Sequence, residues 1–134
     1  MYQGYLVKIG NTKLDFKWIN YADYSITPNQ RQDLDSFRDN NGYLHRTVLP
    51  HTATKIEFNT PPMPESSKME LFGIFENNFT NKQERKLTIN YYSPDTSTYK
   101  TAEVYMPDVQ FQLQTEDEDG QLWYDTMRIA FIEY

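Results

Sequence analysis

The residues best suited to acid–base chemistry are two histidines, His45 and His51, and the chain contains no cysteine. Catalysis by a triad requires a nucleophile, a base and an orienting acid that converge in space, and no nucleophile-elbow pattern accompanies either histidine. Without cysteine, a thiol nucleophile, a disulfide and a cysteine-ligated metal site are excluded. We therefore predict no catalytic residues, no cofactor and no enzymatic activity.

A short acidic stretch, EDEDG at residues 116–120, invites comparison with a calcium-binding loop. Such a loop requires oxygen ligands at alternate positions and a closing bidentate glutamate. With Asp117 and Asp119 as the third and fifth ligands, Thr115 would stand first and Thr126 would close the loop. Neither threonine suits its position, so we predict a solvated hairpin tip and no metal site.

Two tryptophans, Trp18 and Trp123, offer flat aromatic faces of the kind that pack on sugar rings. Both fall on the apolar side of a predicted strand, which favours burial in the core. A carbohydrate platform is the alternative interpretation of these residues.

Length and composition limit what these residues can be part of. With 134 residues the chain is expected to form a single domain over residues 1–134. Its net charge of −6 argues against sequence-specific nucleic-acid binding, which needs clustered lysine and arginine.

Eleven tyrosines and eight phenylalanines favour strands and interfaces. No apolar stretch is long enough for membrane insertion, and the first residues do not resemble a secretory signal.

Alternation of apolar and polar residues predicts a mainly β fold. The helix-like exception is residues 65–79, where Met69, Phe72, Phe75 and Phe79 form one apolar stripe. The expected architecture is an antiparallel β-sandwich or partly closed barrel with one flanking α-helix. Strands are expected over residues 2–9, 13–19, 21–27, 54–60, 85–92, 101–106, 109–113 and 122–134. The first two should form a hairpin, and Pro28 should end the third.

A further hairpin is predicted at about residues 31–50, around the dipeptide Asn41-Gly42. This dipeptide favours a two-residue type I′ turn. Such a turn fixes the register, pairing Leu34 with Leu49, Ser36 with Thr47, Phe37 with Arg46 and Arg38 with His45. Near the tip both faces carry polar or charged groups, so the hairpin is expected to project from the domain.

A two-stranded ribbon is only marginally stable in water, so a neighbouring subunit is expected to hold this hairpin. The alternative is a loose surface loop. The predicted subunit-interface residues are Arg38, Asp39, Asn41, Gly42, Tyr43, His45 and Arg46.

The segment TPNQRQDLDSFRDNNGYLHRTVLPHTATKIEF resembles a family of short tail proteins of phages and prophages of Gram-positive bacteria. In that family an acidic segment precedes an Asn-Gly turn, and a basic residue and a lysine-containing strand follow it. The later segments NYYSPDTSTYKTAEVYMPD and MRIAFIEY resemble it too. The matching residues of the first segment are Asp33, Asp35, Arg38, Asn41, Gly42, Arg46, Lys55, Ile56 and Phe58.

The resemblance implies a tail-tube-like or distal-tail-like fold that assembles into rings, with no catalytic residues. The expected partners are further copies, as a ring of six, and other tail proteins such as the tube, tape measure or baseplate. The expected location is the virion tail, after synthesis in the bacterial host cytoplasm. A carbohydrate- or receptor-binding module at the tail tip is the first alternative, and a small enzyme or enzyme inhibitor is the second.

Overall fold

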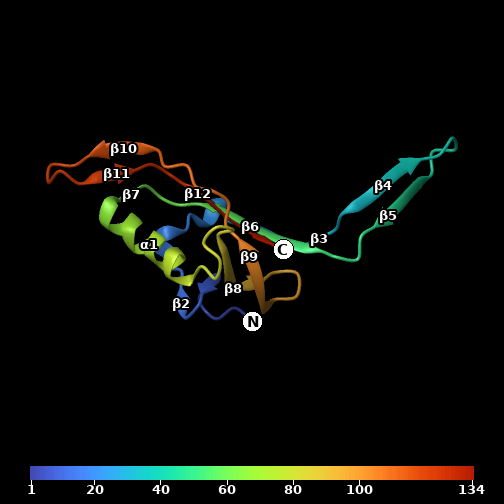
Figure 1. Ribbon diagram of the computed structural model, residues 1–134, viewed down its shortest axis with the longest axis horizontal. Coiled ribbons are helices and arrows are strands. Elements are labelled where there is room, and N and C mark those ends of the chain that lie inside the picture. Colours follow the sequence, from blue (N-terminus) through green and yellow to red (C-terminus); the bar gives the residue numbers. More distant parts are fainter.

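The computed structural model describes residues 1–134 and consists mainly of antiparallel strands with one α-helix (Figure 1). A seven-stranded sheet has the order β2-β1-β8-β9-β12-β6-β3, and smaller sheets have the orders β10-β11-β7 and β4-β5. The strands are β1 (Val7–Ile9), β2 (Thr12–Lys13), β3 (Ser25–Gln30), β4 (Asp33–Arg38), β5 (Leu44–Val48), β6 (Ala53–Asn59), β7 (Met63–Pro64), β8 (Lys86–Ser93), β9 (Thr98–Tyr105), β10 (Leu113–Glu116), β11 (Leu122–Tyr124) and β12 (Arg128–Glu133). The predicted fold class is confirmed, and the sheet stays open at β2 and β3 and forms no closed barrel.

One core of 19 buried residues lies between the seven-stranded sheet and the helix α1 (Glu65–Asn78). Strict alternation along β6 and β8 directs every second side chain into this core, as the sequence predicts. From the helix, the Phe75 ring meets Phe131 of β12 with centroids 6.1 Å apart, and Phe131 in turn lies 6.3 Å from Phe58. The contacts of these aromatic side chains fix α1 against one face of the sheet.

The helix occupies the predicted residues but turns a different side to the core. Leu71 and Phe75 are its buried residues, whereas Met69 is 62% exposed. The predicted stripe is therefore wrong at Met69. The helix also contacts β7 and β11. Its apolar surface is therefore wider than a single stripe of residues three and four positions apart.

The N-terminal hairpin is much shorter than predicted. The strand β2 has only two residues, and the chain then forms the 3₁₀ helices η1 (Phe16–Trp18) and η2 (Tyr21–Asp23). Side chains of Asp15 and Asn20 accept hydrogen bonds from the backbone N–H groups of Lys17 and Ala22 and so cap these turns. The predicted strand at 13–19 is wrong because these local caps compete with strand pairing.

Pro28 does not end the third strand, which runs through it to Gln30. Because β3 is an edge strand, the missing N–H of proline costs it no ladder hydrogen bond. The pairing of β3 with β6 shifts between Thr27 and Gln30, and Asn29 has a φ of 51° at this bulge.

The C-terminal third departs most from prediction. Residues 106–112 form no strand, and Phe111 and Leu113 are exposed, in contrast to the predicted strand at 109–113. The predicted final strand divides into β11 and β12, which belong to different sheets. Within the predicted range, Met127, Ile129 and Phe131 are buried in the core. No helix in the structure has the length and apolar character needed to cross a membrane.

Candidate functional site

The most distinctive surface is a two-stranded ribbon, here called the arm, which comprises residues 31–52 with the strands β4 and β5. The arm projects from the end of the seven-stranded sheet (Figure 1). It continues the β3–β6 pair, because Gln30 and Ala53 are register partners and the Leu49 N–H donates to the Gln32 carbonyl at 2.8 Å. Every residue of β4 and β5 is exposed.

The arm turns through a three-residue loop and not the predicted two-residue turn. The Asp39 N–H donates to the Tyr43 carbonyl at 2.9 Å, and the Gly42 N–H donates to the Asp39 carbonyl at 3.0 Å. Gly42 has a φ of +84°, whereas Asn41 is not in the left-handed region. This combination is a type I turn followed by a glycine bulge, which serves as an alternative way to close a hairpin.

The register of the arm also differs from prediction. Leu34 pairs with Thr47 and Phe37 pairs with His45, so the predicted Arg38–His45 pair does not form. The register shifts between Leu34 and Phe37, where Asp35 has a φ of 53°. This bulge and the longer loop together displace the pairing that a two-residue turn would impose.

Three of the predicted interface residues use their charges inside the arm. The Arg46 guanidinium contacts both Asp33 carboxylate oxygens, with the shortest N–O distance 2.7 Å. His45 Nε2 lies 2.8 Å from Asp39 Oδ2. The hydrogen bonds from Arg46 and His45 hold the pKa values of Asp33 and Asp39, respectively, below their usual range. Arg38 forms no ion pair, and its guanidinium donates to the Gly42 carbonyl at 2.9 Å.

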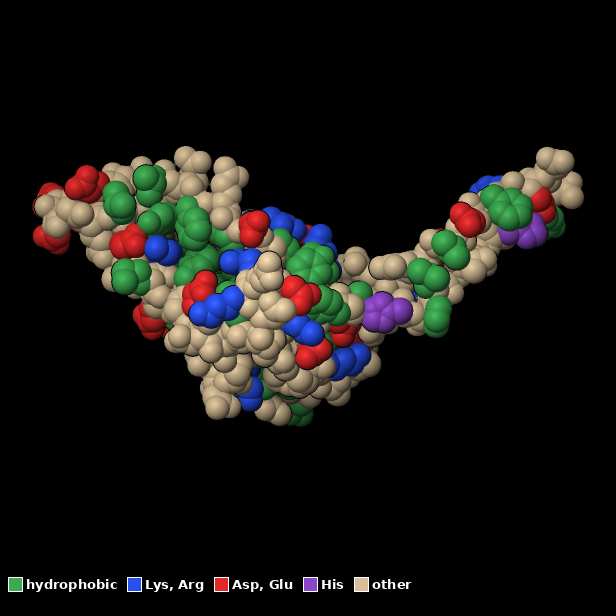
Figure 2. Space-filling view, in the orientation of Figure 1, with side chains coloured by type: hydrophobic (Ala, Val, Ile, Leu, Met, Phe, Trp, Pro, Cys, Tyr) green, Lys and Arg blue, Asp and Glu red, His purple; other side chains and the backbone are tan.

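The arm carries more exposed apolar surface than a solvated loop requires. Green side chains follow its length in Figure 2. Tyr43 is 71% exposed and Phe37 is 59% exposed, although the Phe37 ring stacks on His45 at a centroid distance of 4.8 Å. The register places Leu34 and Phe37 on one face of the ribbon and Leu44 and Val48 on the other, so both faces expose apolar side chains. The large exposed apolar residues of the arm are Leu34, Phe37, Tyr43, Leu44 and Val48.

The base of the arm is anchored by a buried threonine. The Thr54 hydroxyl accepts hydrogen bonds from the Asn29 N–H at 3.1 Å and from the Tyr91 hydroxyl at 3.3 Å. Its own N–H donates to Glu133 Oε1 at 3.0 Å. Buried polar groups that are satisfied in this way favour one geometry, so the arm leaves the sheet in a defined direction.

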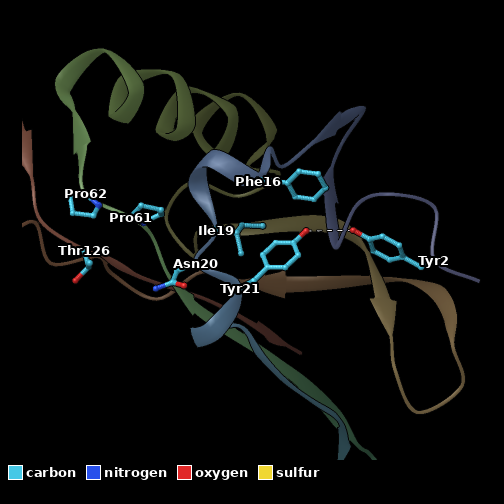
Figure 3. Close-up of a pocket in the computed structure, with 8 residues that line it drawn as sticks. All are labelled: Tyr2, Phe16, Ile19, Asn20, Tyr21, Pro61, Pro62 and Thr126. Carbon is cyan, nitrogen blue, oxygen red and sulfur yellow. Dashed lines mark hydrogen bonds between the residues drawn. The ribbon is translucent and has the colours of Figure 1, made fainter.

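A second surface feature is an aromatic groove of about 600 Å³, which we call the groove (Figure 3). The Phe16 and Tyr21 rings meet edge to face at 5.5 Å, and the Tyr2 and Tyr21 hydroxyls are 3.5 Å apart. The sequence pattern gave no sign of this groove, because Phe16 falls within the predicted strand at 13–19, whereas it is exposed on η1. The groove is lined by Tyr2, Phe16, Ile19, Asn20, Tyr21, Pro61, Pro62 and Thr126.

The acidic stretch forms the tip of the β10–β11 hairpin. Asp117 organises the tip, because its carboxylate accepts from the backbone N–H groups of Asp119 and Gln121 and from the Trp123 indole at 3.1 Å. These hydrogen bonds lower the pKa of Asp117. The structure contains no group of three or more histidine, cysteine or acidic side chains arranged to hold a metal ion.

Comparison with known proteins identifies a family and a fold. The chain belongs to the family described as "Family of unknown function (DUF6711)", whose model matches residues 1–134. A search of curated protein sequences gives no match. The structure is similar to a chain from the tail of an empty GTA particle, solved by helical refinement with C6 symmetry. That similarity has a TM-score of 0.52 at 11% identity and covers 100% of this chain and 95% of the other.

Proposed function

We propose that this family member is a structural protein of a phage or prophage tail and has no enzymatic activity. Copies of the chain associate through the arm into a ring, with six subunits as the expected number. The ring belongs to the tail tube or to the distal tail and baseplate region of the virion. Its neighbours are further tail proteins such as the tube, tape measure or baseplate, and synthesis takes place in the cytoplasm of a Gram-positive host.

The observation that carries this proposal is the arm itself. A ribbon with both faces exposed is held only by the backbone hydrogen bonds between its two strands, and such ribbons are only marginally stable in water. The arm nevertheless has a bulge, a capped turn and two internal ion pairs that fix its shape. A shaped ribbon with five exposed large apolar side chains fits a contact with another protein.

The similarity in fold supports the same proposal. The GTA tail chain aligns with this chain over 95% of its own length and comes from a tail solved with C6 symmetry. The net charge of −6 is also suitable for a tail, because an acidic lumen repels DNA that must slide through it. The net charge does not depend on the arm, so it supports the proposal independently.

The proposal is tested by reversing a charge on the arm. Arg38 is the suitable residue because it forms no ion pair, whereas Arg46 is needed by Asp33 inside the arm. Arg38→Glu should leave the monomer folded, since exposed charges contribute little to stability, and should abolish assembly because repulsion across an interface is costly. Lys82→Glu on the body is the matched control and should assemble like the wild type.

Sedimentation velocity and negative-stain electron microscopy at rising protein concentration provide the measurement. The wild type and Lys82→Glu should form closed oligomers, and Arg38→Glu should remain monomeric with an unchanged circular dichroism spectrum. A wild-type chain that stays monomeric up to about 1 mM, the weak end of protein association, would contradict self-assembly. Equal assembly of Arg38→Glu and wild type would contradict the role of the arm.

The groove favours a second candidate function, a carbohydrate- or receptor-binding module at the tail tip. Exposed rings of Tyr2, Phe16 and Tyr21 stand beside the Asn20 amide, which is the combination that sugar recognition requires. A glycan-array screen of the wild type against a Tyr21→Ser variant distinguishes the two functions. Glycan binding that is lost in the variant would favour this second function over ring assembly.

A further inference from the structure

We propose that the groove receives the arm tip of a second copy of this chain, with Phe37 and Tyr43 as the inserted side chains. The inference rests on the proposed function, since it names the surface on which an assembly arm acts. It goes beyond that function by assigning both halves of the contact to this one chain.

The first argument is the position of the two features in the fold. The strands β3 and β6 run side by side, and the arm begins at one end of this pair, where Gln30 faces Ala53. The groove lies at the other end, where Pro61 and Pro62 follow β6 and the 3₁₀ helix η2 precedes β3. At about 3.3 Å per residue, the seven residues of β6 separate them by roughly 20 Å.

This separation decides which copy can fill the groove. The arm points away from the body, so it cannot fold back into the groove of its own chain (Figure 1). A contact between two different patches of identical subunits is heterologous, and repetition of such a contact closes into a ring or continues as a filament. The placement of the arm and the groove therefore suits the ring that the proposed function requires.

The second argument is matching chemistry. The groove surface is predominantly apolar, formed by aromatic rings and two prolines, which pack well against aromatic side chains. The pKa of the Tyr21 hydroxyl is raised, first by partial desolvation of the hydroxyl group and second by its hydrogen bond with Tyr2. On the arm, Phe37 lies over His45, which holds the ring in one orientation before contact. A preorganised ring loses less side-chain entropy when it binds.

The third argument is charge. Arg31 and Arg38 are the two arginines that form no ion pair within the chain, and both lie on the arm. Carboxylates without a cationic partner lie within two residues of the groove lining. They are Asp15, Asp23 and Asp125, which accept hydrogen bonds only from Lys17 N–H, the Asn20 amide and Thr126 N–H. The arm also carries one unpaired carboxylate, Asp35, but its unpaired charge is net positive. This charge complements the unpaired anions around the groove and steers the approach.

The absence of cysteine allows a direct test by disulfide trapping. The test variant is Asn40→Cys with Pro62→Cys, which places one thiol on the exposed arm tip and one in the groove and keeps Phe37 and Tyr43. The control is Asn40→Cys with Met69→Cys, whose second thiol stands on the exposed side of α1. Both pairs use exposed residues, so folding of the monomer should not change, and circular dichroism checks this.

Mild oxidation of the assembled test variant should give a covalent ladder on a non-reducing gel, ending at the size of the closed oligomer. The control should give none. Oligomers of normal size without a ladder in the test variant would overturn the groove inference and leave the proposed function standing. If neither the test variant nor the wild type formed oligomers, the proposed function and this inference would both be overturned.

A second measurement tests the apolar contact between arm and groove without introducing a disulfide. Phe37→Ser should weaken self-association roughly tenfold or more, as removal of a buried aromatic anchor does. Met69→Ser should leave it unchanged, because Met69 is equally exposed but lies outside both surfaces. Equal association constants for the two variants would overturn the inference.

Discussion

Two hairpins leave the body at opposite ends of the molecule, the arm and the acidic β10–β11 hairpin (Figure 1). Both strands of the arm and all of β10 are exposed. Both hairpins also carry large exposed apolar residues, with Phe37 on the arm and Phe111 just before β10. By exposure alone the two hairpins look alike.

They differ in what holds them. The strand β11 pairs with β7, and the Phe111 ring lies 5.1 Å from Phe72 of α1 and 5.9 Å from Tyr124. The Lys68 ammonium stands 5.8 Å from the Phe111 ring centroid. The arm has no third strand and no helix beside it, and its aromatic contact is Phe37 on His45 within the ribbon.

The comparison shows why exposure alone does not identify a functional surface. The acidic hairpin already has its partner within the chain, so its exposed apolar residues need no further explanation. The arm has comparable apolar residues and a fixed shape without such a partner, and we propose that a second copy supplies it.

The difference between the two hairpins is tested most sharply by replacing Phe111 and Phe37 with alanine in separate variants. Phe111→Ala should lower the free energy of unfolding of the monomer by about 1–2 kcal/mol, because it removes two aromatic contacts and a cation–π contact. Phe37→Ala should change it by less than about 0.5 kcal/mol, as at most surface sites. Chemical denaturation at a low protein concentration measures both values. An equal loss in the two variants would show that the arm packs on its own body.

A smaller effect is expected from pH. The lowered pKa values of Asp33 and Asp39 mean that the folded arm favours their ionised forms. Their contribution to arm order is therefore fully present above the ordinary aspartate pKa of about 3.9 and is lost as the pH falls through the lowered values. Carboxyl NMR titration should locate both shifts. Arg46→Met should return the pKa of Asp33 towards its usual range and leave that of Asp39 lowered; a wild-type Asp33 that titrates normally would refute the ion pair.

The sequence predicted much of the body because strict alternation leaves few choices. In β6, β8 and β9 the apolar residues repeat every second position, and each such run became a buried strand in the main sheet. Local backbone features caused several of the failures. Caps by Asp15 and Asn20 turned parts of two predicted strands, 13–19 and 21–27, into 3₁₀ helices, and the positive φ angles of Asp35 and Gly42 changed the register of the arm.

The candidate site was predictable only in part. The Asn-Gly signal located the arm and its polar tip, but the pairing of Asp33 with Arg46 depends on a bulge that no short pattern encodes. The groove was not predicted at all, because it joins Tyr2, Phe16 and Tyr21 with Pro61 and Pro62 of a distant segment. Such convergence depends on tertiary packing and leaves no periodic signal in the sequence.

Excision of the arm tests the central claim most directly. Because Gln30 and Ala53 are already register partners, an Asn-Gly turn in place of residues 31–52 joins β3 to β6 without disturbing the core. Sedimentation velocity of this variant beside the wild type is the measurement. The account predicts a folded, cooperatively melting monomer where the wild type forms a closed oligomer of six. An excised variant that assembles as the wild type does would contradict it.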